Sequence, residues 1–139
     1  MNSNNGDLHP TRLIIDKSAV AHNVSNYRKL LAPETKMMLM IKAFGYGVGD
    51  IELGQWLEKE HLVDYLGVAY VNEGIALREE AVSLPIMVMN TGVIDLEKVI
   101  AFDLEPTIYN PQQLGDLFQA NPNDIKRIKA HFKIDTGMH

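Results

Sequence analysis

A single lysine follows a short apolar run and precedes a turn rich in glycine. The run Met37–Ile41 reads M-M-L-M-I, Lys42 comes next, and glycines stand at 45, 47 and 49. A run of this length is typical of a strand buried on both faces, and glycine permits the positive φ that a tight turn needs. Lys42 is therefore predicted to lie at the end of a buried strand, where parallel α/β folds build their sites.

A lysine in this position has one chemical role and one structural alternative. Removing an ammonium group from water lowers the pKa of its amine, so that more of the amine is neutral and nucleophilic. Such an amine can condense with a carbonyl compound, including the aldehyde of pyridoxal phosphate. The alternative is a lysine whose stem packs on apolar surface while its ammonium group reaches water. Spacing does not decide between the two.

The glycine turn matches neither common phosphate-binding loop. A dinucleotide-binding G-x-G-x-x-G loop needs glycine at position 50, where this sequence has Asp50. A Walker loop needs its lysine after the turn, whereas Lys42 stands before it. Both kinds of nucleotide site are excluded here.

The segment 41–49, I-K-A-F-G-Y-G-V-G, resembles the cofactor-lysine motif of bacterial alanine racemases, usually V-K-A-N-A-Y-G-H-G. Phe44, Gly45 and Val48 depart from that pattern and resemble the variant in racemase domains fused to the UDP-N-acetylmuramoyl-tripeptide:D-alanyl-D-alanine ligase. The resemblance covers nearly the whole chain from Thr11. It continues in family order through Y-L-G-V-A (65–69), N-E-G-I-A-L-R (72–78), P-I-M-V-M-N (85–90) and K-I-D-T-G-M-H (133–139).

The resemblance implies a role for three residues. Lys42 would bind pyridoxal 5′-phosphate as a Schiff base and move the α-proton of alanine on one face. Tyr46 would donate a hydrogen bond to the cofactor phosphate. Lys133 corresponds to a lysine that is carbamylated in many members and orients an arginine, which would come directly after His139. The second acid–base residue of the family is a tyrosine in a second domain, supplied across a homodimer interface.

A non-catalytic barrel protein that binds pyridoxal phosphate for homeostasis is the alternative reading. Among the other polar residues, His131 is expected to be structural or on the surface, and Asp16, Asp64 and Asp103 are expected to be caps or turn residues. No His, Asp and Glu cluster has the spacing of metal ligands, so no metal is expected.

Hydrophobic periodicity and capping signals predict alternating strands and helices. The expected strands are 11–16, 36–41, 64–69, 84–89, 105–109 and part of 125–134, and the expected helices are 17–31, 50–60, 72–81, 94–102 and 111–120. Alternation from residue 36 onward predicts parallel strands joined by crossover helices, either in an open doubly wound sheet or in part of a (β/α)8 barrel. The resemblance implies a (β/α)8 barrel, a fold of about 250 residues.

We therefore expect an α/β fold: a truncated fragment of a TIM-like (β/α)8 barrel with about five parallel strands. Residues 1–10 are expected to be a disordered arm and residues 11–139 the amino-terminal part of the barrel. The opening strand 11–16 would have lost its partners in the second domain. The fragment alone is expected to be inactive, and its unpaired strand edges predict self-association.

Composition narrows the class of protein. The 139 residues are 46% hydrophobic and 22% charged, with net charge −5 and no cysteine. That balance fits a soluble globular protein and gives no basic surface for nucleic acid. No apolar run approaches the roughly 18 residues of a membrane helix, and the polar amino terminus lacks a signal-peptide core. We expect a cytoplasmic enzyme acting on a small molecule.

Overall fold

A parallel sheet forms the centre of the molecule. The structure, a computed structural model, describes residues 13–92, 95–120 and 128–137. Its strands lie in chain order, and all four neighbouring pairs are parallel. This confirms the predicted α/β class. The strands are β1 (Met38–Met40), β2 (Tyr65–Tyr70), β3 (Ile86–Asn90), β4 (Glu105–Ile108) and β5 (His131–Phe132). The expected arm 1–10 and the last two motif residues, Met138 and His139, lie outside the described residues.

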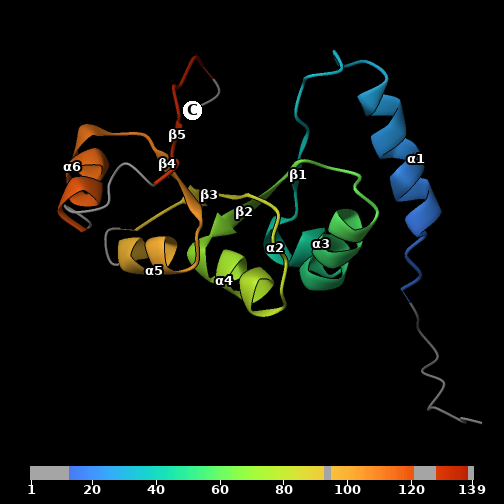
Figure 1. Cartoon of the computed structure of the whole chain (residues 1–139), viewed down its shortest axis with the longest axis horizontal. Helices are drawn as coiled ribbons and strands as arrows, with labels where there is room; N and C mark the ends of the chain where they lie inside the picture. The colour runs from blue at the N-terminus through green and yellow to red at the C-terminus, as the bar shows by residue number, and fades with distance from the viewer. Residues whose placement is uncertain (1–12, 93–94, 121–127, 138–139) are drawn as a thin grey trace, which may run out of the picture.

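The helices connect the strands along one side of the sheet. Figure 1 shows α3, α4 and α5 along one side, while the opposite side, between β1 and β5, carries no described helix. The sheet is therefore an open arc, as expected for part of a barrel. The helices are α1 (Lys17–Arg28), α2 (Lys42–Tyr46), α3 (Asp50–Lys59), α4 (Val71–Glu79), α5 (Leu96–Ala101) and α6 (Pro111–Ala120).

Burial alternates along β3, where the helices cover one face of the strand. In β3, Ile86 and Val88 are fully buried, whereas Met87 and Met89 are half-buried. Burying a Val, Leu or Ile side chain contributes about 1.5–3 kcal/mol, so the helix-covered face holds the sheet together. The fully buried aliphatic side chains of this core are Ile41, Leu57, Leu66, Val68, Leu77, Val82, Ile86, Val88 and Val99.

The prediction that the first apolar run is buried on both faces is wrong. All three residues of β1 are half-buried, and only Ile41, the next residue, is fully buried. β1 is an outer strand and the helices cover one face of the sheet, so its other face and its free edge stay partly open.

The predicted strand 11–16 is also wrong within the described residues. Residues 13–16 form no strand, and Leu13 and Ile14 are 73% and 84% exposed. A strand needs a neighbour for its backbone hydrogen bonds, and no described strand pairs with this segment. Asp16 does cap α1, as expected, because its Oδ1 accepts from the Ser18 backbone N–H at 2.8 Å.

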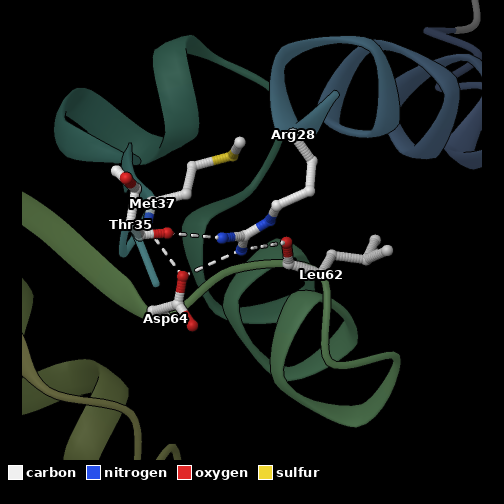
Figure 2. Close-up of polar contacts among 5 residues, drawn as sticks. All are labelled: Arg28, Thr35, Met37, Leu62 and Asp64. Atoms are coloured by element: carbon white, nitrogen blue, oxygen red, sulfur yellow. Dashed lines mark hydrogen bonds and ion pairs between the residues drawn. The ribbon is translucent and has the colours of Figure 1, made fainter. Parts of the chain in front are cut away.

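A hydrogen-bonded cluster ties α1 to the starts of β1 and β2 (Figure 2). Arg28 donates to the Asp64 Oδ2 at 2.8 Å, to the Thr35 carbonyl at 3.0 Å and to the Leu62 carbonyl at 3.4 Å. The same Asp64 oxygen accepts from the Met37 backbone N–H at 2.7 Å. Asp64, expected only as a turn residue, therefore holds three segments together.

Arg78 makes a second link, which the sequence analysis did not foresee. Its guanidinium donates to the carbonyl oxygens of Val82, Leu84, Phe102 and Asp103 at 2.7–3.1 Å. These carbonyls lie in the loops before β3 and β4, so one side chain satisfies both loops. Burial lowers the pKa of Arg78 below its ordinary value.

We predict that Asp64→Asn weakens the fold in a pH-dependent way. The Met37 N–H bond, and after it Arg28, hold the pKa of Asp64 below its ordinary value of 3.8. A lowered folded-state pKa gives stability that is present above 3.8 and is lost as pH falls through the folded value. Asp64 is 38% exposed, so solvent screening limits the expected loss at neutral pH to about 1 kcal/mol.

Urea unfolding of the wild type, Asp64→Asn and the control Glu79→Gln measures this effect. Glu79 is exposed at the end of α4, so its variant should match the wild type throughout. The difference in the free energy of unfolding between the wild type and Asp64→Asn should shrink to zero as the solution is acidified. A difference that stays constant until the carboxyl group is fully protonated would contradict a stabilising role for the Asp64 carboxylate.

Candidate active site

Lys42 lies at the carboxyl end of β1, as the sequence predicted. Met40 pairs with Gly67 of β2, and the Ile41 backbone N–H donates to the Gly67 carbonyl at 2.9 Å. Lys42, the first residue of α2, is half-buried. Within the described ranges, its ammonium group has no hydrogen bond or ion pair. An unpaired amine thus stands at the strand-end edge of the sheet.

The turn that follows Lys42 is left-handed. Successive φ values are 53° for Ala43, 56° for Phe44, 59° for Gly45, 57° for Tyr46 and 94° for Gly47. The sequence predicted an irregular glycine loop, whereas the structure has one left-handed turn that includes non-glycine residues. Residues other than glycine are strained in this conformation, so neighbouring groups must stabilise the turn.

Backbone hydrogen bonds and close packing hold part of the turn. The Gly45 N–H donates to the Ile41 carbonyl at 2.9 Å, and the N–H groups of Gly47 and Gly49 donate to the Phe44 carbonyl at 2.9 and 3.0 Å. Gly45 is buried, and a Cβ there would lie 3.3 Å from the Asp50 nitrogen. The turn thus packs directly against the start of α3. Asp50 is the first residue of that helix and Gly49 is its cap.

Glu73 supplies the remaining support, and the sequence analysis gave it no role. Its Oε1 accepts from the Ala43 N–H at 2.7 Å, and its Oε2 accepts from Ala69 N–H at 2.7 Å and Tyr70 N–H at 3.0 Å. A glutamate three residues after a helix cap often accepts from the cap N–H. That signal was weak because the cap residue is Tyr70 rather than Ser or Thr.

The other predicted site residues are placed in two groups. Tyr46 shares the turn with Lys42 and is 64% exposed. Lys133 follows β5, the outer strand at the far end of the sheet, where its side chain is exposed and its backbone N–H donates to the Ile108 carbonyl at 2.9 Å. The structure therefore brings Lys42 and Tyr46 into one turn and leaves Lys133 on another strand.

His131 is structural, as expected. Its Nε2 lies 2.7 Å from the Oε2 of Glu105, and its ring meets the Tyr65 ring edge-on at a centroid distance of 6.1 Å. Among the described residues, no three His, Asp or Glu side chains converge to hold a metal ion. None of the described helices is long and apolar enough to cross a membrane.

We predict that Gly45→Ala destabilises the turn by about 1–2 kcal/mol, because alanine is strained at positive φ and its Cβ would crowd Asp50. Gly115→Ala in α6 is the matched control. Gly115 has open space around its Cβ position, and alanine there should raise stability by up to about 1 kcal/mol. Thermal unfolding gives the melting temperature of both variants. Equal shifts of the same sign in the two melting temperatures would contradict the left-handed turn.

Comparisons with known proteins agree with this geometry. The family model described as alanine racemase, N-terminal domain, matches residues 15–139. Alanine racemase 1 of Caldanaerobacter subterraneus is 35% identical over 132 residues, which is 94% of this chain and 34% of the relative. The serine/alanine racemase of Enterococcus gallinarum is 34% identical over 124 residues, covering 88% of this chain and 17% of that protein.

A solved structure gives the same result. The alanine racemase of Clostridium difficile 630 superposes with a TM-score of 0.81 at 33% identity, covering 88% of this chain and 32% of that one. The chain thus spans about a third of the length of the alanine racemases it matches. The chain therefore belongs to the alanine racemase N-terminal domain family.

Proposed function

We propose that the protein carrying this chain is a pyridoxal phosphate-dependent racemase that interconverts L- and D-alanine. The observation that carries the proposal is the Lys42 amine at the carboxyl end of β1, which has no partner among the described residues and lies in the turn where the family motif falls. Relatives named alanine racemase support alanine as substrate, and the one named serine/alanine racemase shows that the family extends to another small amino acid.

The residues of the turn fit this cofactor. A free amine can bond covalently to the cofactor aldehyde, and a phenol on the same turn, that of Tyr46, can donate a hydrogen bond to a phosphate oxygen. Once bound, the cofactor supplies an electron sink that makes the α-proton of the amino acid acidic. Lys42 would hold the cofactor and then take or give that proton on one face of the substrate carbon.

Racemisation also needs a second acid–base group on the opposite face. No described residue is assigned to that role, and we infer from the resemblance that a tyrosine of a second domain supplies it across a homodimer. Lys133, in its carbamylated form, would orient an arginine beside the substrate. We further propose a cytoplasmic enzyme whose D-alanine enters peptidoglycan. Fusion to a cell-wall ligase stays a prediction.

We expect this chain to associate with a second copy of itself. A groove of 560 Å³ lies between α1 and β1, lined mainly by Val20, Val24, Tyr27, Leu31, Met38 and Leu39. Tyr27 is 68% exposed there, and the outer edge of β1 has no strand partner among the described residues. Apolar grooves beside open strand edges favour pairing between molecules.

Sedimentation velocity over a range of concentrations measures this association. Tyr27→Glu should shift the protein toward monomer, because a charge in the groove would lose hydration on contact. Phe118→Glu is the control, since Phe118 is 50% exposed on α6, away from the groove. A wild type that stays monomeric at the highest concentration would refute the expectation.

We predict that Lys42→Ala abolishes covalent attachment of pyridoxal phosphate. After incubation with the cofactor and reduction by borohydride, mass spectrometry should find the added mass on the Lys42 peptide of the wild type. Lys59→Ala is the control, because Lys59 is exposed on α3, and it should react like the wild type. Equal labelling of Lys42→Ala and wild type would overturn the assignment of Lys42.

Alanine turnover separates the racemase from the non-catalytic alternative. The protein that carries this chain should convert L-alanine to D-alanine, and Lys42→Ala should remove that activity. Cofactor attachment at Lys42 without any conversion of alanine would favour a protein that only binds pyridoxal phosphate.

A further inference from the structure

Glu73 lies 30 residues beyond Ala43 in the chain and joins two segments at the carboxyl ends of the strands. One carboxylate oxygen accepts from the Ala43 N–H at 2.7 Å, and the other accepts from the Ala69 and Tyr70 N–H groups at 2.7 and 3.0 Å. A carboxylate accepts such bonds strongly because it is charged. Glu73 therefore ties the turn after β1 to the junction between β2 and α4.

The tie acts on the peptide bond next to Lys42. The N–H that Glu73 accepts belongs to Ala43, so this bond fixes the plane of the peptide that joins Lys42 to Ala43. Ala43 itself has a φ of 53°, which an alanine rarely adopts without support. Holding that peptide fixes the direction in which the Lys42 side chain leaves the backbone.

The carboxylate does this without pairing with the amine. Its oxygens are occupied by three backbone N–H groups, and within the described part of the chain the Lys42 ammonium has no ion-pair partner. An ion pair would stabilise the ammonium form of a lysine, which is not nucleophilic. Glu73 can thus position the lysine while leaving its nitrogen free to react.

We propose that Glu73 is a positioning residue for the cofactor lysine. The role rests on the proposed function of Lys42 and deepens it: Glu73 holds the Lys42–Ala43 peptide so that the amine meets the cofactor aldehyde in the productive orientation.

The Glu73→Gln variant tests this role, because an amide has one accepting oxygen and cannot serve all three N–H groups. Hydrogen exchange of the Ala43 amide should become about tenfold faster, as expected for the loss of one charge-assisted hydrogen bond. Attachment of pyridoxal phosphate to Lys42, trapped with borohydride and quantified by mass, should fall by about the same factor, while labelling of Lys59 stays constant.

Two further variants separate positioning from stability. Glu73→Asp keeps the charge and the nearby α4 cap but shortens the reach to Ala43, so it should reduce Lys42 labelling even if Glu73→Gln folds poorly. Glu58→Gln is the matched control. Glu58, near the far end of α3, accepts from the Ser83 N–H at 3.0 Å and from the Ser83 hydroxyl. The Glu58→Gln variant should be less stable than the wild type, and its Lys42 labelling should be normal.

The outcomes distinguish the two proposals. Lys42 labelling that equals the wild type in both Glu73 variants overturns the positioning role and leaves the proposed function standing. An equal fall in Glu58→Gln also overturns it, because the fall would then follow stability alone. A wild type with no label on Lys42 overturns the proposed function and the positioning role with it.

Discussion

Neighbouring strands in this sheet are parallel, so after each strand the chain must cross back to the end of the sheet where strands begin. The helices α3 to α6 therefore lie between consecutive strands in the chain, and the carboxyl ends of all strands lie at the same end of the sheet. This constraint places Lys42, which follows β1, beside the segment that follows β2. The Ile41 N–H to Gly67 carbonyl bond fixes the register at that point. Only then can Glu73, in the first turn of α4, reach the Ala43 N–H.

The left-handed turn is the costly element of the site. Ala43, Phe44 and Tyr46 adopt positive φ without being glycine, and each such residue costs about 1–2 kcal/mol. A hydrogen bond to a charged acceptor contributes about 1.5–3 kcal/mol, so the Glu73 carboxylate offsets a large part of this strain. Gly45 is needed between the strained residues because a larger residue would meet Asp50. The turn is thus maintained by its surroundings rather than by its own propensities.

Local signals in the sequence predicted what depends on local structure. Asp16 caps α1, as its position before the helix predicted. The alternation of apolar runs predicted the parallel sheet, and the motif predicted the place of Lys42. Predictions failed where the answer depends on distant parts of the chain. Whether β1 is buried on both faces depends on which face the helices cover. The contacts of Arg78 and Glu73 reach 25 and 30 residues along the chain, and no local pattern encodes their partners.

Two carboxylates elsewhere in this fold pair with cationic or titratable side chains. Asp64 pairs with Arg28, and Glu105 pairs with His131. Glu73 is different, since its hydrogen-bond partners are three backbone N–H groups although a lysine lies next to one of them in the chain. A nucleophilic lysine has two conflicting requirements, a fixed backbone and an unpaired nitrogen. A carboxylate that binds the neighbouring peptide meets both requirements. It fixes the chain at Ala43, and it accepts hydrogen bonds from backbone N–H groups rather than pairing with the lysine nitrogen. This division explains why the same glutamate can cap α4 and also support the turn beside Lys42.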